Sequence, residues 1–144
     1  MKKVYFACSI RWGRDDADTY SELVKHIKQH ANVLSELFAD GTLTAKGMNK
    51  PSKDIWKTDT DWVKEADVVI AEVSSPSLGV GYEIALAESL GKPILALYRE
   101  QPDKKLSAMI DGAPGVQVVR YKTVEEVKKS IIAFLCTDAF CSLQ

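Results

Sequence analysis

The sequence is poor in cysteine and has no long apolar run. Its 144 residues include only Cys8, Cys136 and Cys141, and an odd, sparse set of cysteines argues against a disulfide framework and is typical of a reducing compartment. No stretch approaches the roughly 20 apolar residues of a membrane-spanning helix, and the apolar run near Met1 is too short for a signal peptide. We therefore expect a cytoplasmic protein, or a nuclear one in a eukaryote, without a membrane partner.

The sequence also lacks an excess of charge and an evident metal site. The 19 basic and 20 acidic residues leave a net charge of −1, which would not attract a nucleic acid polymer. His26 and His30 stand four residues apart without the glutamate of a zinc-protease helix, so we expect no metal centre. Gly79 and Gly81 are not followed by the third glycine of a dinucleotide fingerprint or by a Walker lysine, and we expect no cofactor.

Apolar runs and helix-length segments alternate along the chain. The apolar runs predict buried strands at residues 4–8, 33–37, 68–73, 94–98 and 116–121. The segments between and after them predict helices at residues 15–30, 52–65, 81–90 and 124–135. This alternation favours a single α/β domain, residues 1–136, doubly wound around a five-stranded parallel sheet of order 2-1-3-4-5, as in flavodoxin-like and Rossmann-like folds. We expect residues 137–144 to form a loosely ordered tail.

In a sheet of this order the ligand binds at the carboxyl ends of the first and third strands, so the loops that follow them are the candidate site. The loop after the first strand carries Ser9, Arg11, Gly13 and Arg14 ahead of a helix. A hydroxyl group, two guanidinium groups and free backbone N–H groups at a helix N-terminus suit an anion, most simply a phosphate. The alternative is a polar loop that only caps the helix.

The loop after the third strand leads to an acidic candidate, Glu83. The loop contains three serines, and Gly79 and Gly81 allow a ligand to approach the backbone closely. We expect Glu83 in the first turn of the following helix, where the helix dipole would keep its carboxylate ionised. Such a carboxylate could attack the anomeric carbon of a sugar, although a glutamate in a first turn is also common as a helix cap.

Acid–base chemistry needs a second acid, and the sequence offers several. Asp59 and Asp61 lie in the predicted helix before the third strand. Residues two apart on a helix point in different directions, so at most one of them should face the crevice, and the residues alone do not decide which. Glu72 lies near the crevice end of the third strand and could support the reacting groups, whereas Asp67 lies at the opposite end and is expected to be structural.

Two strings of residues together indicate a family. The run Ala-Asp-Val-Val-Ile-Ala-Glu-Val at residues 66–73, followed by Pro-Ser-Leu-Gly-Val-Gly-Tyr-Glu at residues 76–83, resembles the 2'-deoxynucleoside 5'-phosphate N-hydrolases, relatives of the nucleoside 2-deoxyribosyltransferases. Leu-Ser-Ala-Met-Ile at residues 106–110 matches the same hydrolase branch, and the matches extend from residue 4 to about residue 121. The resemblance implies an enzyme that cleaves the N-glycosidic bond of a nucleoside 5'-monophosphate and releases the base and a (deoxy)ribose 5-phosphate.

The resemblance also implies roles for individual residues. Glu83 would attack C1' and form a glycosyl ester that water then hydrolyses, Asp59 would protonate or orient the departing base, and Tyr5 would lie near the nucleophile. A homodimer is implied, in which the segment 107–109 reaches into the neighbouring subunit's site. The implied substrate-binding set is Cys8, Ser9, Ile10, Arg11, Trp12, Gly13, Arg14, Leu37, Ser77, Gly79, Ser107, Ala108 and Met109.

Three positions depart from the family's pattern and leave the base preference open. Trp12 stands where purine-preferring hydrolases have a glycine, so its indole could stack on a base, narrow the pocket in favour of a pyrimidine, or pack on the surface. Leu37 replaces a family histidine, and Cys8, which we expect to pack rather than react, replaces a glycine. A deoxyribosyltransferase and a non-catalytic nucleotide sensor remain as alternatives; the phosphate-side residues argue against the first, and the intact catalytic set against the second.

Overall fold

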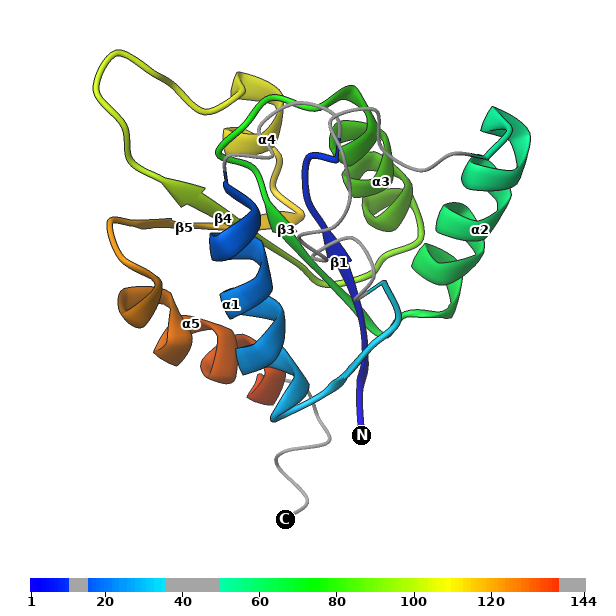
Figure 1. Ribbon diagram of the computed structural model, residues 1–144, viewed down its shortest axis with the longest axis horizontal. Coiled ribbons are helices and arrows are strands. Elements are labelled where there is room, and N and C mark those ends of the chain that lie inside the picture. Colours follow the sequence, from blue (N-terminus) through cyan, green and yellow to red (C-terminus); the bar gives the residue numbers. More distant parts are fainter. Residues whose placement is uncertain (11–15, 36–49, 138–144) are drawn as a thin grey trace.

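A five-stranded sheet forms the centre of the computed structural model, which describes residues 1–10, 16–35 and 50–137 (Figure 1). All neighbouring strands are parallel, in the order β2-β1-β3-β4-β5. The strands are β1 (Lys3–Ala7), β2 (Asn32–Val33), β3 (Val68–Glu72), β4 (Ile94–Arg99) and β5 (Val116–Tyr121). The predicted fold and strand order are therefore confirmed.

Helices cover both faces of the sheet. Helices α1 (Ala17–Lys28) and α5 (Val124–Cys136) lie together on one face, and α2 (Ser52–Glu65) and α3 (Leu78–Ser89) lie together on the other (Figure 1). A short helix, α4 (Ala108–Asp111), contacts β5. Every residue of β3 is buried, as expected of a central parallel strand that is covered on both sides. In the described part of the chain, no helix has the length and apolar character needed to cross a membrane.

The second strand is much shorter than the predicted run of residues 33–37, and that prediction was wrong in its extent. Strand β2 contains only Asn32 and Val33. Beyond it, the Ser35 hydroxyl accepts a hydrogen bond from the Phe6 N–H at 2.8 Å and donates one to the Phe6 carbonyl at 2.8 Å. The Ser35 side chain thus occupies the N–H and C=O groups of Phe6, which the next residues of the β1–β2 pairing would otherwise use, and the pairing ends there.

Helix α3 begins three residues before the predicted range of 81–90. The Ser77 hydroxyl caps it by accepting a hydrogen bond from the Val80 N–H at 3.2 Å, which satisfies one of the free donors of the first turn. Gly79 and Gly81 consequently belong to the helix's first turn, not to the loop. The predicted end is correct, because Gly91 adopts a φ of 69° just after the helix, a conformation that glycine accepts readily.

The remaining predicted elements agree with the structure to within two residues at each end. Residues 138–144 of the predicted tail lie outside the described ranges, so its loose ordering stays a prediction.

Candidate active site

A cleft of about 970 Å³ opens at the carboxyl ends of β1 and β3, where the strand order predicts a ligand. Its walls come from the loops after these two strands, from α2 and α3, and from the segment that leads into α4. The predicted site residues that line this cleft are Cys8, Ser9, Ile10, Asp59, Ser77, Gly79, Glu83, Ser107 and Met109.

Glu83 lies in the cleft, but its carboxyl group is not held in the ionised form that the sequence predicts. Because α3 begins at Leu78, Glu83 falls in the second turn, beyond the strongest influence of the helix N-terminus. Burial raises the pKa of Glu83 to about 8, the Tyr5 hydroxyl opposes this rise, and the negative charge of Asp59 adds to it. The expectation that the helix dipole keeps this carboxylate ionised is therefore wrong, since loss of hydration outweighs the dipole.

Asp59 is the aspartate of α2 that faces the cleft. Its side chain is buried, and its Oδ1 atom, like Oε2 of Glu83, finds no hydrogen-bond partner among the described residues. Burial raises the pKa of Asp59 to about 6, against the opposing charge of Lys50. Asp61, by contrast, is exposed and pairs with Lys57 through a distance of 2.7 Å between Oδ2 and Nζ. The packing of α2 thus makes the choice between the two acids that their spacing left open.

Tyr5 completes a cluster of three titratable side chains. It lies on β1, is fully buried, and has a pKa raised by burial first and then by the charges of Glu83 and Asp59. The phenol therefore stays protonated and is a hydrogen-bond donor beside Glu83, where it favours the carboxylate form. Two carboxyl groups from α2 and α3 therefore line this part of the cleft, and the phenol from β1 lies buried beside them.

The first turn of α3 brings a hydroxyl group and an open backbone close to the nucleophile candidate. A methyl group added at Gly79 would lie 3.9 Å from both Oγ of Ser77 and Oε1 of Glu83. A side chain at Gly79 would therefore contact both groups, and the glycine leaves that volume unfilled.

The loop after β1 is only partly described. Cys8 and Ser9 are buried and Ile10 is half-buried, and all three line the cleft. Five predicted site residues lie outside the described residues: Arg11, Trp12, Gly13 and Arg14 of this loop, and Leu37, which replaces a family histidine. Their roles therefore stay predictions.

The segment around α4 borders the cleft of its own chain. Ser107 precedes the first residue of α4, and Ser107 and Met109 line the cleft, with Met109 81% exposed. Ala108 does not line it and instead borders a separate hollow beside Tyr98 and Arg120. The sequence grouped these three residues together, whereas the short helix points them to different sides.

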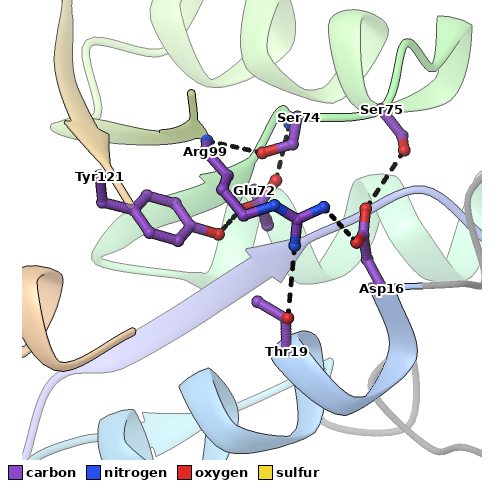
Figure 2. A network of polar contacts seen from close by, with 7 residues as sticks. All are labelled: Asp16, Thr19, Glu72, Ser74, Ser75, Arg99 and Tyr121. Carbon is purple, nitrogen blue, oxygen red and sulfur yellow. Dashed lines mark hydrogen bonds and ion pairs between the residues drawn. The ribbon is translucent and has the colours of Figure 1, made fainter. Parts of the chain in front are cut away.

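The predicted supporting acid, Glu72, lies behind the cleft and does not line it. Its side chain is 1% exposed; Oε1 accepts a hydrogen bond from the Ser74 N–H at 2.6 Å, and Oε2 accepts one from the Tyr121 hydroxyl (Figure 2). Asp67, expected to be structural, accepts a hydrogen bond from the Lys3 N–H at 2.8 Å at the other end of the sheet.

Sequence reasoning missed several lining residues. Ile55 lies one turn before Asp59 on α2, and Ser74 and Ser75 follow β3; all three line the cleft. The spacing of four residues between Ile55 and Asp59 is a signal that they share a helix face. Ser74 and Ser75 were recognised as loop residues but not chosen individually. Within the described ranges, no group of histidine, cysteine, aspartate and glutamate side chains could hold a metal ion.

Comparison with known proteins assigns the chain to a family. Residues 4–128 match the nucleoside 2-deoxyribosyltransferase family. The chain belongs to this family. The 5-hydroxymethyl-dUMP N-hydrolase of Mus musculus is 49% identical over 112 residues, which make up 76% of this chain and 65% of the mouse protein. The enzyme of the same name from Danio rerio is 45% identical over 126 residues, 85% of this chain and 88% of the fish protein.

A solved structure supports the fold. The CMP N-glycosidase BcmB of Clostridium botulinum superimposes with a TM-score of 0.67 over 92% of this chain and 99% of its own, at 20% identity. The relatives within the family are N-hydrolases, so the predicted resemblance to the hydrolase branch is confirmed.

Proposed function

We propose that the cleft hydrolyses the N-glycosidic bond of 2'-deoxynucleoside 5'-monophosphates through a covalent glycosyl ester on Glu83. The observation that carries this proposal is that Asp59 and Glu83 line one cleft with the buried Tyr5 beside them, and that the rim of this cleft is a serine-rich loop and a capped helix N-terminus. The mouse and zebrafish relatives, both named N-hydrolases of a deoxynucleotide, support the same reaction and substrate class.

In the first step the Glu83 carboxylate attacks C1' of the sugar. The C1'–O bond forms as the C1'–N bond breaks, and the bonding electron pair leaves with the base. Asp59, in its protonated form, transfers a proton to the base nitrogen and neutralises that electron pair. In the second step water attacks C1' of the ester, Asp59 removes a proton from this water, and Glu83 is released as a carboxylate with deoxyribose 5-phosphate.

The pKa values of the two acids favour a protonated Glu83 and an ionised Asp59 near neutral pH. With values of about 6 for Asp59 and about 8 for Glu83, the pair holds one proton near neutral pH. The reaction needs the opposite arrangement, with Glu83 ionised and Asp59 protonated, so Glu83 must lose its proton and Asp59 gain one before C1' is attacked. The Tyr5 hydroxyl favours that arrangement because it stabilises the carboxylate form of Glu83.

The 5'-phosphate would bind between the two loops at the rim. The Ser77 hydroxyl and the backbone N–H groups of Leu78 and Gly79 can donate to its oxygens, whereas those of Val80 and Gly81 already donate to Ser77. The predicted partners from the other loop are Ser9, Arg11, Gly13 and Arg14.

The protein would act as a homodimer in which Ser107 and Met109 also border the neighbouring subunit's site. The exposure of Leu78, 97%, and of Met109, 81%, supports this assembly, because both apolar side chains stand at the cleft's rim without cover from the described residues. The sparse cysteines support a cytoplasmic or nuclear location.

The decisive experiment is a panel of ribonucleoside and 2'-deoxyribonucleoside 5'-monophosphates, including 5-hydroxymethyl-dUMP, with chromatography of the released base. We expect release from deoxynucleotides, a loss of at least about 10³-fold in kcat for Glu83→Gln, and retained nucleotide binding by that variant in calorimetry. A free acceptor base added to the assay should not yield an exchanged nucleotide. An active Glu83→Gln variant would refute the nucleophile, and exchange would indicate a transferase.

A further inference from the structure

A polar network outside the cleft joins four elements at the carboxyl edge of the sheet (Figure 2). Nη2 of Arg99, at the end of β4, pairs with Oδ1 of Asp16, the residue before α1, at 2.5 Å. The Ser75 hydroxyl donates to Oδ2 of the same aspartate at 3.4 Å. Asp16 therefore bridges the end of β4 and the loop after β3.

A second part of the network holds the adjoining residue of that loop. The Arg99 N–H donates to Oγ of Ser74 at 2.7 Å, and the Ser74 N–H donates to Oε1 of Glu72 at 2.6 Å. The other Glu72 oxygen accepts the hydrogen bond of Tyr121 from β5. Hydrogen bonds with Arg99 and Glu72 thereby fix both the hydroxyl group and the backbone N–H of Ser74.

The network does not touch the cleft except through these two serines. Ser74 and Ser75 line the cleft, whereas Asp16, Glu72, Arg99 and Tyr121 do not. Glu72 is 1% exposed and Tyr121 2% exposed. A buried carboxyl group destabilises a fold unless its hydrogen bonds are fully made. Both oxygens of Glu72 accept hydrogen bonds, one from Ser74 in the loop after β3 and one from Tyr121 of β5. These buried polar groups are concentrated where the loop after β3 leaves the sheet.

We infer that Arg99, Asp16, Glu72 and Tyr121 are positioning residues that hold the loop after β3 in the geometry that binds the substrate's phosphate. This inference rests on the proposed function. The loop runs from Ser74 to the cap Ser77 and continues into the helix that carries Glu83, so its position sets where a bound phosphate lies relative to the nucleophile. Loss of the network should impair capture of the phosphate far more than the chemistry at C1'.

The test compares four variants of the full chain with the wild type. Tyr121→Phe removes only the hydroxyl group, Arg99→Met removes the ion pair, and Arg99→Lys restores a charge without the second guanidinium nitrogen that donates to Thr19. The matched control is Arg120→Met on the adjacent strand β5, which breaks an exposed ion pair of 3.2 Å between Arg120 and Asp111 of α4. Steady-state kinetics on a deoxynucleoside monophosphate give kcat and KM, inorganic phosphate serves as a competitive inhibitor, and circular dichroism reports folding.

We expect Tyr121→Phe and Arg99→Met to raise KM and the inhibition constant of phosphate together by about 10-fold, a loss equivalent to one or two network hydrogen bonds. Their kcat should change by less than about 3-fold. Arg99→Lys should recover part of the loss, and Arg120→Met should leave both constants unchanged. Folded variants with unchanged KM and phosphate inhibition, or an equal loss in Arg120→Met, would overturn the inference.

The two proposals fail in distinguishable ways. If the wild type releases no base from any nucleotide, the proposed function fails, and phosphate binding measured by calorimetry still tests the network across the same variants. If the wild type is active and binds phosphate but the network variants match it, only the positioning role fails. If Arg99→Met does not fold, Tyr121→Phe and Arg99→Lys decide the question. A wild type that neither turns over nucleotides nor binds phosphate overturns both proposals.

Discussion

At the scale of single residues, two carboxyl groups share a cleft in which burial dominates their protonation. Asp59 and Glu83 come from different helices, and each has its pKa raised primarily by loss of hydration. Buried, unsatisfied acids destabilise a fold, so their retention is typical of functional sites. This trade-off between stability and activity is open to direct measurement.

Glu83→Gln should stabilise the protein, and more so as the pH rises. The folded state holds the Glu83 proton up to a pKa of about 8, against 4.5 for an unperturbed glutamate. The wild type therefore loses stability as the pH rises from about 5 to above 8, by a few kcal/mol at most, because folding then requires a buried charge. The amide carries no such charge.

Urea unfolding of both proteins at pH 5, 7 and 9 checks this prediction. The stability advantage of the variant should be small at pH 5 and largest at pH 9. Parallel stability curves for the two proteins would show that Glu83 titrates normally in the folded state.

Asp59→Asn and Asp61→Asn should differ sharply, although the two residues are two positions apart. Asp59→Asn removes the proposed proton donor and should lower kcat by about 10²- to 10⁴-fold. Asp61→Asn removes only an exposed ion pair with Lys57 and should change unfolding free energy by less than about 1 kcal/mol, with activity retained. Kinetics and chemical denaturation of both variants provide the measurement, and similar losses of kcat would remove Asp59 from the mechanism.

At the scale of elements, the start of α3 is the feature that the sequence predicted least well and that affects the site most. The serine cap moves the helix start from residue 81 to Leu78, which brings Gly79 into the first turn and places Glu83 in the second. Glycine is a poor helix former, so its presence near the nucleophile suggests that open space is needed there.

Gly79→Ala should therefore stabilise the protein and weaken substrate binding. The gain in helix propensity is at most about 1 kcal/mol. The added methyl group would lie 3.9 Å from Oγ of Ser77 and from Oε1 of Glu83, in the space that a ligand must enter, so KM should rise. Gly81→Ala is the stability comparator, because its methyl group meets no atom within 4 Å in the described structure. An unchanged KM in Gly79→Ala would show that ligands do not occupy this space.

At the scale of the whole molecule, the open question is whether one chain or two complete the site. Ser107 and Met109 border the cleft of their own chain, and the exposed Met109 is also available to a second subunit. We expect Met109→Asp to be inactive, because it places a carboxylate at the cleft where the substrate's phosphate would bind, and mixing it with the inactive Glu83→Gln separates these arrangements.

If residues 107–109 complete the neighbouring subunit's site, each heterodimer of the two variants contains one intact site. An equal mixture should then recover about a quarter of the wild-type activity after subunit exchange. If the segment serves only its own chain, every site in the mixture carries one of the two defects and activity stays absent. Size-exclusion chromatography with light scattering gives the oligomeric state of each sample.

Alternating apolar runs and helical segments determined the doubly wound sheet, its strand order and the edge at which the cleft opens, because these follow from local periodicity and short connections. The sequence also placed Glu83 and the serine-rich loop at that edge. It missed the early end of β2, since the Ser35 hydroxyl that replaces the ladder acts across the space between two strands. Residue spacing left Asp59 and Asp61 equivalent, and the family resemblance favoured Asp59; only tertiary packing buried Asp59, raised the pKa of Glu83 and turned Glu72 away from the cleft. Burial and through-space neighbours depend on how elements pack together, and the order of residues along the chain does not contain that information locally.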